Sequence, residues 1–537
     1  MAELPIYDFV KRYAESGTVR LHMPGHKGRP FLGCEAFDLT EVAGADALYE
    51  ADGIIRESEE EATRLFGTGC TVYSTEGSSQ CIRAMLYLAL TLPRSAAGLE
   101  GIARGINTDA ALGTSAVPRQ VAAARPLILA ARNVHKAFLY AAALLDFEIR
   151  WLMPERTEQN ERPLNACATE AEEVQASDSI CSCPITAGGL RRALSACPKR
   201  PAAVYVTSPD YLGGMADIAG LAAACHAAGT LLLVDNAHGA YLHFLNPSLH
   251  PMDLGADFCC DSAHKTLPVL TGGAYLHMSR RFGEAENLRA LAKDAMALFG
   301  STSPSYLILC SLDMCNQYLA GQYAQRLAAM ATQLEECRKR LRAAGLSVLQ
   351  TDPLRLVLRG DGFGMARWLR ERQLECEYAD KDYLVLMLTP ENTEEELRRL
   401  EDALLLWRKE SAKEQADILH RTLHQTRPQT QITGNSAAAA VVHLNMERSA
   451  AAPSAVVSSA AEPPAAVLSV REALFRPHEA VAAEEAIGRI CASPTVSCPP
   501  AVPIVMPGER IDAQAVALLK TYGIRTVHVV AEKREDL

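Results

Sequence analysis

Short apolar runs alternate with helix-like stretches between about residues 65 and 280, and polar or glycine-bearing residues flank each run. The runs are rich in Val, Leu, Ile and Tyr, whereas the stretches between them have apolar positions at helical spacing. The runs lie at 71–75, 126–131, 202–208, 231–239, 257–266 and 272–278, and these ranges include the polar residues that follow some of the runs. This alternation predicts an α/β fold with a mostly parallel sheet covered by helices. It also places the distinctive polar residues at strand ends, where such sheets bind their ligands.

The pattern changes after about residue 340. A long amphipathic helix over 317–344 ends at Gly345, strand, helix and strand alternate across 347–390, and a charged helix over 392–412 follows. We therefore predict an N-terminal arm and large domain at 1–340, a small α/β domain at 341–412, an Ala/Ser/Pro-rich linker at 413–468 and a C-terminal α+β subdomain at 469–537. Two polar insertions, at 95–124 and 155–199, are expected to leave the sheet, and the sequence gives them no role.

Composition and charge narrow the class of protein. The 537 residues are 49% hydrophobic and 22% charged, a globular mix, and the formal charge of -11 without a long basic run argues against nucleic acid as a partner. No apolar stretch approaches the roughly 18 residues that cross a bilayer, and the first residues lack the order of a signal peptide. Sixteen scattered cysteines fit a reduced compartment. We expect a cytoplasmic protein without membrane contact.

Two strand ends carry residues that together predict pyridoxal phosphate as a cofactor. Asp235 ends one predicted strand, and Lys265, flanked by Ser262 and His264, ends the next. A lysine amine forms a Schiff base with the cofactor's aldehyde, and an aspartate keeps the pyridine nitrogen protonated so that the ring takes up electrons. Either residue alone is interpreted more simply, as a surface lysine or a helix cap. The joined pattern favours the cofactor site.

That chemistry sets requirements on both residues. A free lysine has a pKa near 10.4, so the site must lower the pKa of Lys265 by burial and nearby positive charge. Asp235 must in turn raise the pKa of the ring nitrogen, and each unit of such a shift corresponds to about 1.36 kcal/mol.

Further candidates are weaker on their own. Gly77, Ser78 and Ser79 lie between a predicted strand and helix, where backbone amides and hydroxyls bind phosphate, although Glu76 must then point away from that phosphate. His135 follows another strand and could lie against the cofactor ring. We predict no metal site, because the paired histidines at 22 and 26 are separated by a helix-breaking Pro-Gly.

The order of several motifs along the chain is similar to that of a known family. The motifs are LHMPGHKG (21–28), EGSS (76–79), RNVHKA (132–137), VYVTSPDYLGG (204–214), VDNAHGAY (234–241), SAHKTLP (262–268), TSPSY (302–306), AIGRI (486–490) and PPAVPIVMPGE (499–509). Together they resemble the bacterial ornithine/lysine/arginine decarboxylases, which are fold type I pyridoxal-phosphate enzymes. The resemblance covers most of the chain and leaves out the insertions and the linker.

The resemblance implies a role for each candidate. Lys265 would be the Schiff-base lysine, Asp235 the partner of the pyridine nitrogen, and His135 the residue stacked on the ring. Ala237 would pack on the opposite face of the ring, with His238 near the phenolic oxygen or the substrate carboxylate. The phosphate would be held by Gly77, Ser78, Ser79, Ser262 and His264, and Thr207 would line the pocket. In such enzymes a neighbouring subunit completes the site, so a homodimer or a higher homo-oligomer is implied, with TSPSY serving in that contact.

The chain departs from the family pattern at three positions. Glu76 stands where Asn or Asp is usual, Asn236 replaces a frequent Glu, and Asp210 replaces a small residue. These departures affect the fine geometry rather than the cofactor. The position of HMPGHK at 22–27 leaves no room for the wing domain of the longer members, so the short form is the better comparison.

The resemblance implies decarboxylation of a basic amino acid in polyamine metabolism, with arginine preferred, then lysine, then ornithine. Glu509 is the candidate that would meet the substrate's distal cationic group. Because the same lysine and aspartate also serve aminotransferases and lyases, these reactions remain an alternative. The intact pair argues against a third interpretation, a non-catalytic relative.

Overall fold

The computed structural model describes residues 3–92, 125–154, 179–283, 285–425, 466–494 and 501–532. A seven-stranded sheet organises the largest part of the chain. Its strands are β1 (Cys70–Ser74), β2 (Leu127–Ala131), β3 (Glu148–Leu152), β4 (Ala203–Thr207), β5 (Leu231–Asp235), β6 (Phe258–Asp261) and β7 (Ala274–Met278). They are arranged in the order β1-β7-β6-β5-β4-β2-β3, and all are parallel except β7. The predicted α/β fold is confirmed.

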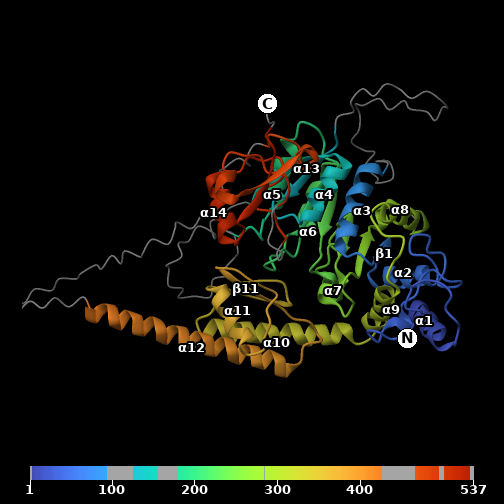
Figure 1. Ribbon diagram of the computed structural model, residues 1–537, viewed down its shortest axis with the longest axis horizontal. Coiled ribbons are helices and arrows are strands. Elements are labelled where there is room, and N and C mark those ends of the chain that lie inside the picture. Colours follow the sequence, from blue (N-terminus) through green and yellow to red (C-terminus); the bar gives the residue numbers. More distant parts are fainter. Residues whose placement is uncertain are drawn as a thin grey trace, which may run out of the picture.

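Both faces of this sheet are covered by helices, which explains why its strands are apolar on both sides (Figure 1). The helices α3 (Ser78–Thr91), α4 (Lys136–Leu145) and α8 (Ala285–Ala297) pack on one face. The helices α5 (Ala187–Ser195) and α6 (Ile218–Ala227) pack on the other. Because α5 belongs to this covering layer, the predicted insertion 155–199 is too long at its C-terminal end. Residues 95–124 and 155–178 lie outside the described residues.

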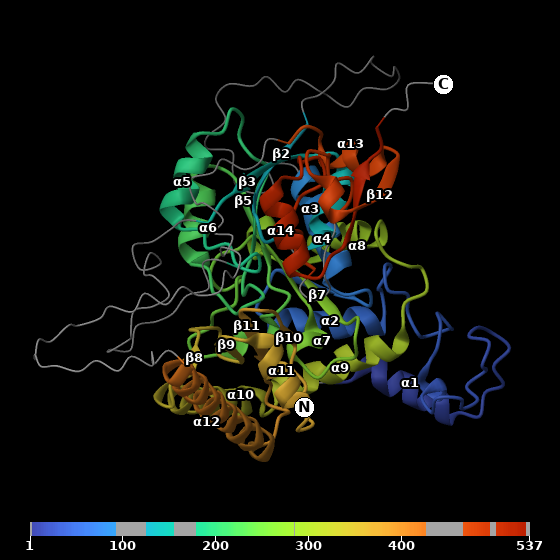
Figure 2. The ribbon, with the colours of Figure 1, turned by 60° about the vertical axis from the view of Figure 1, so that its left-hand side comes forward.

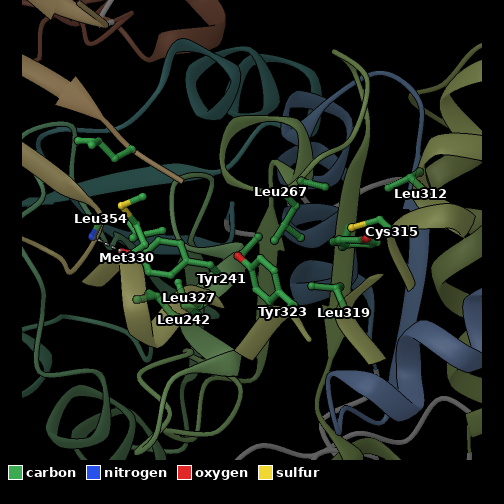
Figure 3. Close-up of a cluster of buried hydrophobic side chains, with 14 of the residues drawn as sticks. Tyr241, Leu242, Leu267, Leu312, Cys315, Leu319, Tyr323, Leu327, Met330 and Leu354 are labelled. Atoms are coloured by element: carbon green, nitrogen blue, oxygen red, sulfur yellow. Dashed lines mark hydrogen bonds between the residues drawn. The ribbon is translucent and has the colours of Figure 1, made fainter. Parts of the chain in front are cut away.

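Two N-terminal helices, two helices from the middle of the chain and a second sheet share one hydrophobic core. The helices are α1 (Pro5–Glu15), α2 (Ile54–Leu65), α9 (Tyr306–Ala320) and α10 (Tyr323–Ala343). The sheet has the order β10 (Tyr378–Ala379), β11 (Tyr383–Met387), β9 (Arg355–Arg359), β8 (Ser347–Val348), and α11 (Gly362–Arg370) packs on it. Figure 3 shows how Leu267, just after α7 (Ala263–Thr266), Leu327 of α10 and Leu354, just before β9, lie in this single cluster.

Helix α12 (Glu394–Gln425) runs beside α10 (Figure 1) and continues past the predicted end at residue 412. The start of the predicted linker at 413 is therefore wrong as a structural boundary, because the helix continues through it. The rest of the linker up to residue 465 lies outside the described residues, and the division into domains stays a prediction. Across the described residues, no helix is long and apolar enough to cross a membrane.

The C-terminal segment packs against the large domain. It contains α13 (Val470–Phe475), β12 (His478–Ala482), α14 (Ala513–Thr521) and β13 (Thr526–Val530), and its two strands pair antiparallel. Figure 2 shows it beside α4, and Arg471 donates a 2.5 Å hydrogen bond to the carbonyl of Ala143 at the end of that helix. At the opposite end of α4, next to the candidate residues, the backbone N–H of Lys136 donates a 3.3 Å hydrogen bond to the carbonyl of Ala501, so the segment also reaches the strand ends.

Candidate functional site

The carboxyl ends of the parallel strands bring the predicted residues to one edge of the sheet. Asp235 is the last residue of β5, and Thr207, the last residue of β4, lies directly beside it in the strand register. Lys265 lies in the short helix α7 (Ala263–Thr266), which begins immediately after β6. Since β5 and β6 are neighbours, the predicted pair lies at the same edge of the sheet, where the charge of Asp235 acts on Lys265.

Lys265 has the environment that a nucleophilic amine requires. Its Nζ lies 3.0 Å from Nε2 of His238, and burial lowers the pKa of Lys265, although the carboxylates of Asp235 and Glu377 act to raise it. A lowered pKa increases the fraction of neutral amine at neutral pH. The predicted depression of the pKa is thus present, and burial rather than neighbouring positive charge is its main cause.

His238 is the nearest titratable partner of that amine. Burial, reinforced by the positive charge of Lys265, lowers the pKa of His238 well below its ordinary value, so its imidazole is neutral. The ring of Tyr211 lies edge-on to it, with the centroids 5.3 Å apart. A neutral imidazole 3.0 Å from Lys265 can exchange a proton with that amine.

Asp235 is a fixed buried carboxylate with 2% of its surface exposed. Its Oδ2 accepts a 2.9 Å hydrogen bond from the Tyr205 hydroxyl, and its Oδ1 accepts one from the backbone N–H of Ala237 at 3.2 Å and a weak one from the Cys260 thiol at 3.7 Å. These donors hold the carboxylate in one orientation. Tyr205 is buried in β4, next to the strand of Asp235, and no local motif marks it; only the strand register identifies it as a partner of Asp235.

His135 caps the N-terminus of α4, where its Nδ1 accepts a 3.2 Å hydrogen bond from the N–H of Ala137. Burial lowers the pKa of His135 to about 4, and the charges of Asp235 and Lys265 both act on it. The predicted ring-stacking residue is therefore neutral and lies within electrostatic range of the central pair.

The pKa of His135 predicts a pH dependence of stability. Its folded-state pKa lies below the unfolded value of 6.5, so the unfolded chain binds more protons between about pH 4 and pH 6.5. The contribution is fully present above pH 6.5 and is lost as the pH falls towards 4. In His135→Asn, which keeps a capping oxygen but does not titrate, the free energy of unfolding should vary less steeply in this window, by up to about 1.36 kcal/mol per pH unit. Parallel curves for the two proteins in denaturant titrations would contradict this assignment.

A cradle at the start of α3 matches the predicted phosphate site. Gly77 has a left-handed backbone with φ of 71°, and a Cβ there would meet only Cε1 of His264, at 4.0 Å. The hydroxyl of Ser262 donates a 2.8 Å hydrogen bond to that of Ser78, and Ser79 is half-buried in the same helical turn. The first amides of a helix, a glycine with open space and converging hydroxyls form an anion-binding arrangement.

Glu76 does not compete with an anion in this cradle. Its carboxylate accepts a hydrogen bond from the backbone N–H of Ser301 and is exposed. The side chain is therefore held by the segment that precedes TSPSY, which removes the objection raised by its position in the sequence.

The residues in the cleft fit pyridoxal phosphate. The cradle suits a phosphate, the fixed carboxylate of Asp235 suits a protonated pyridine nitrogen, and Lys265 suits an aldehyde. The hydroxyl of Thr207 is buried and has no hydrogen-bond partner among the described residues, as expected for a group that awaits a ligand. Ala237, two residues after Asp235 and with 7% of its surface exposed, has a small apolar side chain that would suit a face of the ring.

Glu509 does not fit its predicted role. It is 1% exposed, and its two carboxylate oxygens accept hydrogen bonds from Arg132 at 2.5 and 2.6 Å, while the backbone N–H of Met506 donates a third. A carboxylate held in this way is not available for the distal group of a substrate. We correct the prediction: Glu509 joins the C-terminal segment to the end of β2.

This correction changes the expected effect of Glu509→Gln. Removing one partner of a buried ion pair should lower the free energy of unfolding by about 3 kcal/mol, because Arg132 loses its counter-charge. The KM for a basic amino acid should not change. Denaturant unfolding and steady-state kinetics test both statements, with the exposed Glu485→Gln as a control expected to stay within about 0.5 kcal/mol of the unmodified chain.

One group of buried side chains has the composition of a metal site. His250, Cys259 and Asp261 bring ligand atoms within 4.8 Å of one another. Asp261 nevertheless has its hydrogen bonds satisfied: its Oδ2 is 3.0 Å from His250 and 3.1 Å from His277, and its Oδ1 accepts from the Asn236 amide at 2.7 Å. We interpret the group as a hydrogen-bond network that holds Asn236, and thereby the backbone next to Asp235.

Comparison with known proteins gives consistent matches. The model of the "Orn/Lys/Arg decarboxylase, major domain" matches residues 109–354, and that of the "Orn/Lys/Arg decarboxylase, C-terminal domain" matches residues 448–523. The chain is 24% identical to an arginine decarboxylase of Bacillus subtilis and 26% identical to one of Halalkalibacterium halodurans, in each case over 96% of this chain and 93% of the relative. The fold is similar to that of a solved lysine decarboxylase of Francisella novicida, with a TM-score of 0.68 at 15% identity over 99% of this chain and 81% of that one.

Proposed function

The chain belongs to the Orn/Lys/Arg decarboxylase family of pyridoxal-phosphate-dependent carboxy-lyases, and on this premise we propose that it decarboxylates arginine in preference to lysine and ornithine. The products would be agmatine, cadaverine or putrescine, which are precursors or members of the polyamines. The observation that carries the proposal is the half-buried amine of Lys265, whose pKa is lowered and which lies 3.0 Å from His238 at the same edge of the sheet as Asp235. The order of substrates is supported by the arginine decarboxylases among the relatives.

In this proposal each residue of the cleft has a defined task. When bound, pyridoxal phosphate supplies an aldehyde that carries the substrate's amine and a protonated ring that takes up the electrons left by carbon dioxide. Asp235 would keep the ring nitrogen protonated, and His135 and Ala237 would pack against the two faces of the ring. Gly77, Ser78, Ser79, Ser262 and His264 would hold the phosphate, and Thr207 would line the pocket.

Lys265 and His238 are the candidate proton donors to the α-carbon of the substrate. Loss of carbon dioxide leaves the α-carbon in need of one proton, and Lys265 Nζ or His238 Nε2, which are 3.0 Å apart, can deliver it. The low pKa of both groups follows from burial, so either can return to its neutral form after the transfer. The same burial keeps water from the reacting carbon and favours departure of an uncharged gas.

We also propose that the enzyme is a cytoplasmic homodimer with a shared active site. The N-terminal arm exposes large apolar side chains, among them Leu21 at 90%, Phe31 at 82% and Leu32 at 90%, which a second copy would cover. The segment TSPSY follows Ser301, whose N–H binds Glu76 beside the cradle, so it is positioned for a contact near the site. All described cysteines are free thiols, in agreement with a reducing compartment.

The activity test uses each amino acid separately. The purified protein, supplied with pyridoxal phosphate, is incubated with arginine, lysine or ornithine, and both carbon dioxide and the amine product are quantified. We expect agmatine and carbon dioxide in equal amounts, formed fastest from arginine. Transfer of the amino group to a keto acid without release of carbon dioxide would overturn the proposal.

A further inference from the structure

The second sheet has an exposed carboxylate, Glu377, whose charge acts on Lys265. Glu377 immediately precedes β10, and its backbone N–H donates a 3.0 Å hydrogen bond to the carbonyl of Val385 in β11. This bond fixes its place at the edge of the small-domain sheet, while its side chain reaches solvent. Neither the motifs nor the spacing of residues in the sequence drew attention to it.

A continuous path of contacts joins this carboxylate to the reactive amine. The hydroxyl of Tyr211 donates a 2.7 Å hydrogen bond to Oε1 of Glu377. The ring of Tyr211 contacts His238 edge-on, and His238 lies 3.0 Å from Lys265. Tyr211 is itself held by Arg355, which donates a 3.1 Å hydrogen bond to its carbonyl. The path therefore leads from Lys265, where the substrate's α-amine would bind, through His238 and Tyr211 to the carboxylate of Glu377.

Electrostatics agrees with this geometry. After Asp235, Glu377 is the carboxylate with the largest effect on Lys265, whose pKa it acts to raise. A negative charge that acts on Lys265 also acts on a cation bound in the same cleft.

The other carboxylates around the cleft already have partners. Asp210 accepts hydrogen bonds from the backbone of its own loop, Asp352 and Asp380 from neighbouring tyrosines, and Glu509 from Arg132. Glu377 accepts one side-chain hydrogen bond, and within the described part of the chain no arginine or lysine forms an ion pair with it. It therefore has an oxygen available for a ligand.

We propose that Glu377, together with Tyr211, forms the subsite that binds the distal cationic group of the substrate. The inference rests on the proposed function and replaces the role first expected of Glu509. The substrate's α-amine would lie at Lys265, its alkyl chain would pass the rings of His238 and Tyr211, and its guanidinium or ammonium group would meet Glu377. A charge-assisted hydrogen bond and the face of a tyrosine ring both favour such a cation.

The test compares Glu377→Gln with a matched neighbour. Loss of the charge should raise the KM for arginine by about 10- to 100-fold while kcat changes less, since a hydrogen bond to a charged group contributes about 1.5–3 kcal/mol. Tyr211→Phe, which keeps the ring, should raise the KM by a smaller factor. Glu375→Gln is the control, because Glu375 lies two residues away and pairs with Arg370 on the surface. The cofactor absorbance should be unchanged in all three variants.

Two further ligands, citrulline and agmatine, test whether Glu377 recognises the charge of the distal group. Citrulline has the shape of arginine without its charge, so the preference for arginine over citrulline should fall in Glu377→Gln. Agmatine, which has the guanidinium group but no carboxylate to lose, should bind this variant more weakly by the same factor. If the unmodified enzyme releases carbon dioxide from arginine and Glu377→Gln keeps the same KM and preference, the subsite is overturned and the proposed function stands. If the unmodified enzyme decarboxylates no basic amino acid, both fail.

Discussion

Replacement of Lys265 by alanine should abolish both decarboxylation and covalent attachment of pyridoxal phosphate. The amine of Lys265 is the group with a lowered pKa at the end of β6, next to His238 and in one cleft with Asp235. We expect kcat/KM to fall by at least about 10⁴-fold, equivalent to more than ~5 kcal/mol of transition-state stabilisation. The yellow absorbance of the bound cofactor should disappear as well.

Borohydride reduction followed by mass spectrometry identifies the modified lysine directly. The unmodified protein should carry the reduced adduct on Lys265, and the alanine variant should carry none. Lys136→Ala is a suitable control, because Lys136 follows His135 at the cleft and should leave the adduct in place. An adduct that persists in Lys265→Ala would show that another amine holds the cofactor.

Replacement of Asp235 by asparagine should have the second largest effect. The amide has nearly the same shape but no charge, so it cannot keep the pyridine nitrogen protonated, and the ring loses its capacity to accept electrons. We expect kcat to fall by about 10²- to 10⁴-fold, which is equivalent to about two to four pKa units, or about 3 to 5 kcal/mol. The cofactor should remain attached to Lys265 with an altered absorbance spectrum.

Two further variants separate the charge of Asp235 from its orientation. Tyr205→Phe keeps the carboxylate and removes its 2.9 Å hydrogen bond, so a much smaller loss of kcat is expected, of about tenfold or less. Asp382→Asn alters an exposed carboxylate of the small domain and should have no effect. Equal rates for Asp235→Asn and the unmodified enzyme would refute the role given to this carboxylate.

The strand ends and the central pair could be predicted from the sequence because their signals are local. An apolar run followed by Asp235 or by Lys265 is visible within ten residues, and the parallel order of the strands places both at one edge. The same holds for Gly77, whose left-handed backbone suits the turn between β1 and α3.

The sequence could not reveal contacts between residues that are far apart along the chain. Glu509 is separated from Arg132 by more than three hundred positions, and its motif gave no sign that an ion pair occupies it. Tyr205 and Glu377 each depend on how strands or domains pack against one another. Helix α12 passed its predicted end because the Gln- and Ala-containing residues that follow are compatible with a helix, although their composition suggested a linker.

The hydrophobic cluster in Figure 3 has a consequence for the choice of substrate. Leu267, two residues after Lys265, and Leu354, just before β9, belong to one cluster of buried hydrophobic side chains. Close packing of this kind resists hinge-like opening, so the span between Lys265 and Glu377 is set by the scaffold. In the proposed subsite, amino acids should therefore be selected by length as well as by charge, and shorter diamino acids should not reach Glu377 from Lys265.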